Sequence, residues 1–125
     1  MNVGPVGRVH FARFAAATND FNPVHVDDDF ARTAGLPSVV GSGLLAVAVI
    51  AETLGERTIG RRLSVRFKQP ILPGAVLACE PAHDGSCEVR TQDGQVVAVG
   101  RVDSLPPAAD GPAGQAVSTS GAGSR

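Results

Sequence analysis

The chain has 125 residues, and eleven Lys and Arg against twelve Asp and Glu leave a net charge of −1. That balance, without a long basic run, excludes nucleic acid as an expected partner. The longest apolar run, Leu44 to Ala51, has eight residues, far short of the roughly 20 that cross a bilayer. No signal segment opens the chain, so we expect a cytoplasmic protein with no membrane partner.

Composition divides the chain near residue 105. Residues 106–125 are mostly Pro, Gly, Ala, Ser and Thr, with too little apolar surface to become ordered. We expect residues 1–104 to form a single domain and residues 105–125 to be a disordered tail. A domain of about one hundred residues buries only roughly 60–70% of its unfolded surface, so a homodimer or a higher homo-oligomer is expected.

Helical segments come first along the chain. Apolar residues at three-and-four spacing predict a short amphipathic helix from Val6 to Thr18. A second helix is expected to start at the N-cap Asp27, with Asp28 and Asp29 in its first turn, and to end at Gly35. No second ligand set follows this acidic run at loop spacing, so we expect no metal site.

A third helix is expected after Gly41, because Ser42 can act as its N-cap and Gly55 can end it. The segment is apolar on every side until Glu52, so such a helix must be buried. Periodicity alone also fits a core strand. The length of about a dozen residues and the flanking Ser and Gly favour the helix.

Four strand-like stretches follow, at about residues 60–70, 74–82, 86–92 and 95–104. They are separated by Pro73-Gly74, Asp84-Gly85 and Asp93-Gly94, and Asp-Gly between alternating segments is a strong hairpin signal. Helices followed by an antiparallel meander indicate the α+β class. The pattern by itself fits several small α+β folds.

Two cysteines and two histidines are not expected to take part in chemistry. Cys79 and Cys87 lie eight positions apart without a Cys-x-x-Cys pair or a histidine at metal-ligand spacing. We expect both to be reduced residues of the core or of strands. His10 and His83 have no companion residues at useful spacing, and we expect surface or structural roles for them.

Asp20 and His25 are the main candidates for chemistry, five residues apart. A strand would set them about 17 Å apart on opposite faces and a helix roughly 140° apart around its axis, so neither element brings them together. A turn at Asn22-Pro23 can, and the Asn side chain can tie that loop to itself. A converging carboxylate and imidazole suit general acid–base catalysis. On spacing alone, a cap and a surface histidine explain the pair more often.

The run Asn19 to Asp27, Asn-Asp-Phe-Asn-Pro-Val-His-Val-Asp, is similar to the Gly-Asp-x-Asn-Pro-x-His-x-Asp signature of MaoC-like hydratases and dehydratases. The similarity covers most of residues 8–104. It implies a hot-dog fold, an antiparallel sheet wrapped around one long buried helix. It also implies that Asp20 and His25 act together on the water that is added or eliminated, and that Asn22 shapes the loop.

The start of the third helix suggests a second part of this site. If Ser42 caps the helix, the N–H groups of Gly43 and Leu44 lie at the positive end of its dipole. An enolate-like thioester oxygen is stabilised there, and Gly43 has no Cβ to obstruct a substrate. Without the resemblance, glycines that merely permit a tight turn are the simpler explanation.

Basic residues gather after this helix. Arg61, Arg62, Arg66 and Lys68 are candidates to contact the phosphates of coenzyme A or an acyl carrier protein. A solvated strand face explains them equally well.

Two residues depart from the family pattern. Asn19 stands where glycine is usual, and Asn is the best substitute if the backbone there needs a positive φ. Ser42 stands where the family usually has histidine, and serine is a good N-cap. Neither change removes an acid or a base. The first family strand would have to fit within Met1 to Val6.

The resemblance implies a carbon–oxygen lyase without a cofactor. It would interconvert trans-2-enoyl and (3R)-hydroxyacyl thioesters of coenzyme A or an acyl carrier protein. Two alternatives stay open: a tailoring dehydratase or cyclase in a biosynthetic pathway, and a non-catalytic acyl-binding hot-dog subunit. The Asp-x-Asn-Pro-x-His order disfavours a thioesterase.

Overall fold

The computed structural model describes residues 1–104, so the prediction of a disordered tail at 105–125 lies outside the described residues. The elements are β1 (Asn2–Val6), α1 (Arg8–Ala17), η1 (Pro23–His25), α2 (Asp28–Thr33), α3 (Gly43–Leu54), η2 (Gly55–Thr58), β2 (Arg61–Phe67), β3 (Ala75–Pro81), β4 (Ser86–Arg90) and β5 (Val96–Ser104). The predicted α+β class is confirmed, and β1 occupies the short stretch left for a first strand.

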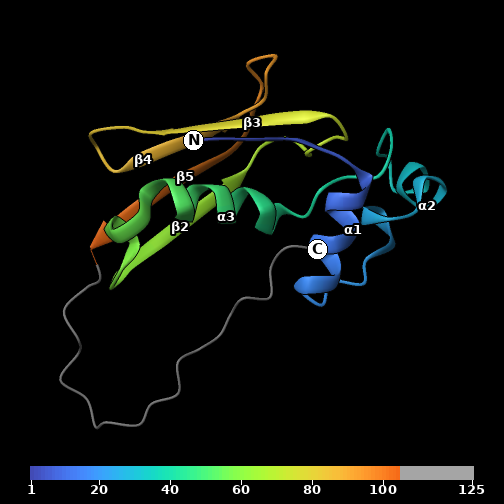
Figure 1. Ribbon diagram of the computed structural model, residues 1–125, viewed down its shortest axis with the longest axis horizontal. Helices are drawn as coiled ribbons and strands as arrows, with labels where there is room; N and C mark the ends of the chain where they lie inside the picture. The colour runs from blue at the N-terminus through green and yellow to red at the C-terminus, as the bar shows by residue number, and fades with distance from the viewer. Residues whose placement is uncertain (105–125) are drawn as a thin grey trace, which may run out of the picture.

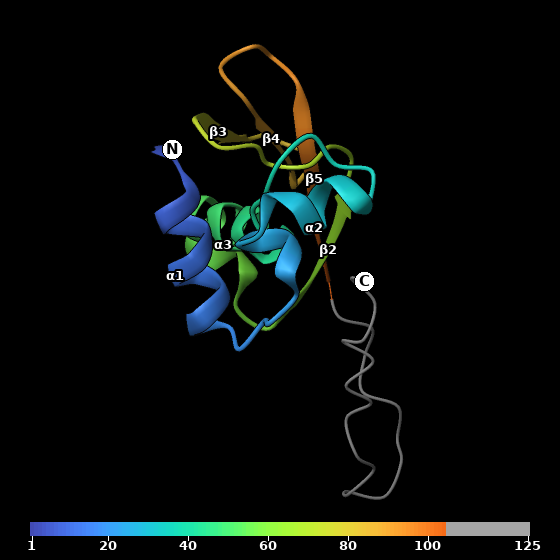
Figure 2. The ribbon, with the colours of Figure 1, turned by 90° about the vertical axis from the view of Figure 1, so that its right-hand side faces the viewer.

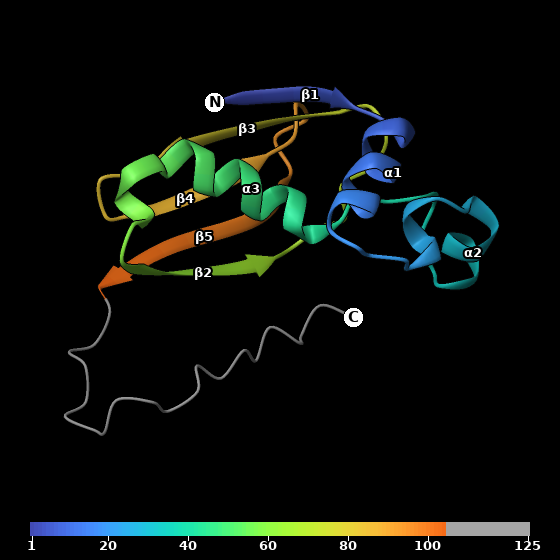
Figure 3. The ribbon, with the colours of Figure 1, turned by 60° about the horizontal axis from the view of Figure 1, so that its bottom comes forward.

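The strands form one antiparallel sheet in the order β1-β3-β4-β5-β2, and α3 lies along one face of it (Figures 1 and 3). The two predicted Asp-Gly hairpins join β3 to β4 and β4 to β5. The meander predicted from β2 onward is wrong at its first step, because β2 pairs with β5 and not with β3.

β2 forms the edge of the sheet opposite β1. From there, Leu63 and Val65 of β2 pack against the core. The chain then runs back past the start of α3, where Gly41 and Ile71 form a bridge. The Pro73-Gly74 pair therefore ends a crossover and not a hairpin.

The core lies between α3 and the sheet. Val49, Ile50 and Leu54 of α3 are buried, and a Cβ added at Gly100 of β5 would lie 2.9 Å from Cγ2 of Ile50. At this point α3 packs so closely on β5 that the strand has room only for glycine. The prediction that this helix is buried on every side is wrong for Leu44, which is 46% exposed, because the sheet covers only one side of α3.

Cys79 and Cys87 are joined by a disulfide, so the expectation that both are reduced is wrong. The β3–β4 register pairs Cys79 with Val89 and Cys87 with Pro81. The two cysteines are thus diagonal neighbours on one face of the sheet, with Cα atoms 6.5 Å apart, within the range of disulfides. Spacing along the chain does not reveal this register.

The two shorter helices lie beyond one end of the sheet (Figures 2 and 3). Asp27 accepts the N–H groups of Asp29 and Phe30 at 2.9 and 3.1 Å, which confirms the predicted cap of α2. Arg8 of α1 and Asp28 of α2 form an ion pair at 2.7 Å. Among residues 1–104, no helix is long and apolar enough to span a membrane.

Candidate functional site

The loop between α1 and η1 turns sharply at Asn19. Its φ is 55°, so the residue occupies the left-handed region that Asn tolerates better than other side chains. The next N–H, of Asp20, donates to the Ala15 carbonyl at 2.8 Å. The positive φ for which Asn is the best substitute is therefore present at this departure from the family pattern, directly before Asp20.

Asn22 then begins a short 3₁₀ turn. Its side-chain oxygen accepts the N–H of Val24 at 3.2 Å, and its own N–H donates to Asp20 Oδ1 at 3.1 Å. Pro23 occupies the first position of η1, where its fixed φ suits the turn. The predicted closure of the loop on itself is confirmed in geometry.

This turn brings Asp20 and His25 together. Asp20 Oδ2 lies 3.0 Å from His25 Nε2. His25 is 7% exposed, whereas the Asp20 side chain is one-third exposed. The imidazole is thus held inside the protein and the carboxylate lies between it and solvent.

The contact of the second ring nitrogen of His25, Nδ1, indicates which ring atoms carry hydrogens. His25 Nδ1 lies 2.8 Å from the carbonyl oxygen of Val40, which can only accept, so Nδ1 carries a hydrogen. Nε2 then meets a carboxylate oxygen at hydrogen-bond distance, which requires one hydrogen between them. The pair holds one exchangeable proton, either on the imidazole or on Asp20.

Asp20 and His25 open onto a cleft of about 490 Å³. Its walls come from four parts of the chain: the loop after α1, the start of α3, the end of β2 with the segment that follows, and β5. Several apolar side chains line the cleft: Val24, Val40, Ala46, Phe67, Ile71 and Val97. The arrangement suits a small substrate with an apolar chain beside an acid–base pair.

Ser42 caps α3 as predicted, and it is buried at the edge of the cleft. Its hydroxyl accepts the N–H of Leu44 at 3.3 Å. The expectation that both Gly43 and Leu44 offer free N–H groups is therefore wrong for Leu44. Gly43, which lines the cleft, supplies the remaining N–H at the positive end of the helix.

Gly43 also contacts Phe67 of β2. A Cβ at position 43 would lie 3.0 Å from two atoms of the Phe67 ring, tighter than most Cβ contacts in proteins, so the ring would have to shift. The absence of a Cβ at Gly43 therefore makes room for the Phe67 ring at the start of α3. Phe67 itself lines the cleft and is 45% exposed.

The basic residues after α3 separate into two groups. Lys68 lines the cleft and also a neighbouring groove of about 370 Å³, which it shares with Arg66 and Arg101. Arg61 and Arg62 line neither hollow, because they begin β2 and Lys68 follows its end, roughly 20 Å away along an extended strand. The sequence pattern gave no reason to group Arg101 with these residues.

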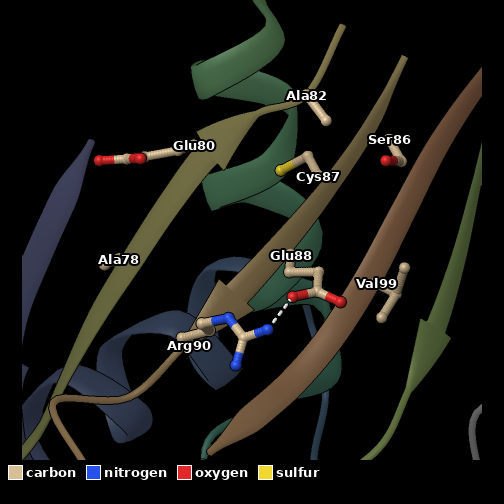
Figure 4. Close-up of a pocket in the computed structure, with 8 residues that line it drawn as sticks. All are labelled: Ala78, Glu80, Ala82, Ser86, Cys87, Glu88, Arg90 and Val99. Atoms are coloured by element: carbon tan, nitrogen blue, oxygen red, sulfur yellow. Dashed lines mark hydrogen bonds and ion pairs between the residues drawn. The ribbon is translucent and has the colours of Figure 1, made fainter. Parts of the chain in front are cut away.

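A further hollow lies on the face of the sheet away from α3 (Figure 4). Figure 4 shows Glu88 and Arg90 paired across it, with Glu80 to one side. It shares no residue with the cleft of Asp20 and His25. Within residues 1–104, no group of three or more His, Cys, Asp or Glu side chains is placed to hold a metal ion.

Asp28 contacts the backbone of Val39, the residue before Val40, which lines the cleft. The Arg8 guanidinium, followed by the backbone N–H of Val39, holds the pKa of this carboxyl below its usual value of 3.8. Asp28 Oδ1 accepts the Val39 N–H at 3.0 Å. From the sequence alone, Asp28 is expected only to place negative charge in the first turn of a helix.

The comparison with protein families gives one match. A family model described as "MaoC like domain" covers residues 4–104. The (R)-specific enoyl-CoA hydratase of Aeromonas caviae is 32% identical over 79 residues, which are 59% of this chain and 59% of that protein. The 3-hydroxyacyl-thioester dehydratase X of Mycobacterium tuberculosis is 38% identical over 61 residues, 48% of this chain and 22% of that protein.

A longer relative is the fatty acid synthase beta subunit pigK of Monascus ruber, 34% identical over 83 residues, which are 62% of this chain and 4% of that protein. The chain thus spans between 4% and 59% of the length of these three relatives.

Two solved structures carry the same fold. HtdX of Mycobacterium tuberculosis superposes with a TM-score of 0.75 at 26% identity, over 84% of this chain and 47% of that chain. R-hydratase PhaJ1 of Pseudomonas aeruginosa superposes with a TM-score of 0.66 at 24% identity, over 89% and 88% of the two chains. The predicted hot-dog fold, a sheet wrapped around one helix, is confirmed.

Proposed function

Because the chain belongs to the MaoC-like family of hydratases and dehydratases, we propose that it interconverts trans-2-enoyl and (3R)-hydroxyacyl thioesters. The observation that carries this proposal is the contact of Asp20 Oδ2 with His25 Nε2 at 3.0 Å, beside a cleft lined by several apolar side chains. We propose the same boundaries for the catalytic domain as for the fold, residues 1–104.

The shared proton of the pair is sufficient for the reaction. In hydration, the water oxygen bonds to C3 of the enoyl group, the π bond between C2 and C3 breaks, and C2 takes a proton. Asp20 accepts the proton that water loses, and His25 Nε2 delivers the proton to C2. Transfer from Asp20 back to His25 across their hydrogen bond restores the starting state. Dehydration follows the same steps in reverse.

The start of α3 supplies the electrostatic part of the mechanism. Negative charge develops on the thioester oxygen when C3 is attacked and again when C2 loses a proton. The Gly43 N–H, at the positive end of the helix dipole, is proposed to donate to that oxygen. Asn22 is proposed to hold the loop, since its backbone and side chain bond to Asp20 and Val24.

The carrier of the acyl group is proposed to pass Lys68. Lys68 joins the cleft to the groove of Arg66 and Arg101, so a phosphate of coenzyme A or a phosphopantetheine group would meet positive charge at the exit of the cleft. Arg61 and Arg62 are proposed as more distant contacts, at the far end of β2.

Self-association is also proposed. Leu44 and Phe67 expose 46% and 45% of their surface near the cleft, and β2 is an edge strand of the sheet. A homodimer or higher homo-oligomer would cover apolar surface that a small domain leaves open.

The test is hydration of crotonyl-CoA, measured as the decrease in absorbance of the enoyl thioester. Asp20→Asn is expected to lower turnover at least ~10²-fold while the protein stays folded. Asp29→Asn is the matched control, because Asp29 is an aspartate of the same region whose side chain is 95% exposed. Near-normal turnover of Asp20→Asn would overturn the assignment. A folded wild-type protein that does not hydrate crotonyl-CoA would favour one of the two alternatives. Poor self-association in solution would then indicate the non-catalytic acyl-binding subunit, and normal self-association the tailoring dehydratase or cyclase.

A further inference from the structure

Asp28 connects two elements to a stretch of backbone that has no regular structure. Its Oδ2 atom pairs with Arg8 of α1 at 2.7 Å, and its Oδ1 atom accepts the Val39 N–H at 3.0 Å. Asp28 is the first residue of α2. Neither Val39 nor Val40 belongs to a helix or strand, so contacts from other segments must hold them in place.

Val40 uses both of its backbone groups near the candidate catalytic pair. Its N–H donates to the Val24 carbonyl at 3.0 Å, and its own carbonyl accepts from His25 Nδ1 at 2.8 Å. The Val24 contact ties the stretch to the loop that carries His25. The Asp28 contact, one residue earlier, ties it to α2 and through Arg8 to α1. The carbonyl is thus held from both sides.

We propose that Asp28 is a positioning residue, which holds the Val39–Val40 backbone so that the Val40 carbonyl keeps the hydrogen of His25 on Nδ1. The proposal rests on the proposed function for its kinetic consequence. While Nδ1 is committed to Val40, Nε2 is the ring atom that exchanges a proton with Asp20. If the carbonyl moved away, either ring nitrogen could carry the hydrogen, and part of the population would present the wrong tautomer to Asp20.

The alternative is that Asp28 only stabilises the packing of α1 on α2. The two roles use different atoms, which makes them separable. The Arg8 pair needs the negative charge, whereas the Val39 N–H needs only an acceptor at the right place. Asp28→Asn keeps an oxygen for Val39 and removes the charge, while Asp28→Ala removes both. Asp29→Ala is the matched control, because it removes a neighbouring carboxylate that is 95% exposed and pairs with the exposed Arg32.

The direct readout is the tautomer of His25, measured from the ¹⁵N shifts of its ring and assigned by their disappearance in His25→Asn. A protonated Nδ1 is expected in the wild type, in Asp28→Asn and in Asp29→Ala, whether Nε2 or Asp20 holds the shared proton. In Asp28→Ala, Nδ1 is expected to be protonated in only part of the population. This measurement needs no substrate, so it tests the positioning role even if the protein hydrates no thioester.

The kinetic readout is crotonyl-CoA hydration across pH. Asp28→Ala is expected to lower kcat about tenfold with KM changed less than about twofold, and to alter the pH profile. Asp28→Asn is expected to restore most of the rate. The other titratable or charged groups that line the cleft with His25 are Asp20 and Lys68, and both are unchanged in these variants.

Three results would overturn the proposal. One is an unchanged tautomer and pH profile in Asp28→Ala. Another is an equal loss of kcat in Asp28→Asn and Asp28→Ala, which would assign the effect to the Arg8 charge pair.

If Asp28→Ala does not fold, hydrogen exchange of the Val39 amide is compared in Asp28→Asn and Arg8→Gln. Slow exchange in both is expected, and fast exchange in Asp28→Asn would be the third contrary result.

Discussion

Asp20 Oδ2 contacts His25 Nε2 at 3.0 Å, while the other nitrogen of the same ring is held by the Val40 carbonyl. The two side chains are therefore proposed to act together in proton transfer. Asp20→Asn and His25→Asn are each expected to lower kcat by at least ~10²-fold, and the double variant to lose little more than either single variant. Steady-state hydration of crotonyl-CoA measures all three. Losses that multiply in the double variant would show two independent groups.

Gly43→Ala is expected to destabilise the protein by about 1–3 kcal/mol, because the added Cβ would lie 3.0 Å from the Phe67 ring. Phe67→Leu removes the ring, so the Gly43→Ala change made in that background is expected to cost clearly less. Urea unfolding of the four proteins measures this coupling. Equal costs in both backgrounds would mean that the ring does not require the glycine.

Ser42→Ala is expected to lower the free energy of unfolding by about 1 kcal/mol, because the hydroxyl that accepts the Leu44 N–H is lost. Ser42→Asp keeps an acceptor at the N-cap and adds favourable charge at the helix start, so it is expected to lose less. The comparison uses urea unfolding at neutral pH. An Ala variant as stable as the wild type would contradict the capping role.

Acid should weaken the contribution of Asp28 to stability. Its pKa in the folded protein lies below the ordinary 3.8, chiefly because of Arg8 and then the Val39 N–H. A carboxyl of lowered pKa stabilises the fold above its unfolded pKa and loses that contribution as pH falls through the folded pKa. The wild type is therefore expected to exceed Asp28→Asn in stability above about pH 5 by a margin that shrinks below about pH 4.

The control for that titration is Asp29→Asn, whose difference from the wild type is expected to vary much less over the same range. Unfolding by urea at several pH values gives both curves. A margin for Asp28→Asn that grows on acidification would contradict the sign of the pKa shift.

The positive charges beside the cleft are expected to affect binding of the thioester carrier and not the rate of the chemical step. Replacing Arg66, Lys68 or Arg101 by Ala is expected to raise KM for crotonyl-CoA several-fold, with kcat little changed and the effect smaller at high salt. The same variants are expected to handle crotonyl-pantetheine, which lacks phosphate, like the wild type. Arg61→Ala is the control, since Arg61 lines neither hollow. An equal rise in KM for both thioesters would contradict phosphate recognition.

Features that depend on neighbours in sequence could be predicted from the chain alone. The caps at Asp27 and Ser42 and the turn at Asn22-Pro23 are decided by side chains that bond to backbone two or three residues away. The Asp-Gly hairpins are similarly local. These signals located the three helices, and the likeness to a known signature identified Asp20 and His25 as the pair of interest.

Features that join distant residues required the tertiary structure. The pairing of β2 with β5, the disulfide between Cys79 and Cys87, and the contact of Gly43 with Phe67 depend on register and on which segment covers which face. The Val40 carbonyl on His25 could not be read from residue types at all, because every residue has a carbonyl and only packing decides which one faces the ring. The sequence by itself determined the local turns and identified Asp20 and His25 as the candidate pair, and the long-range packing decided how that pair is oriented.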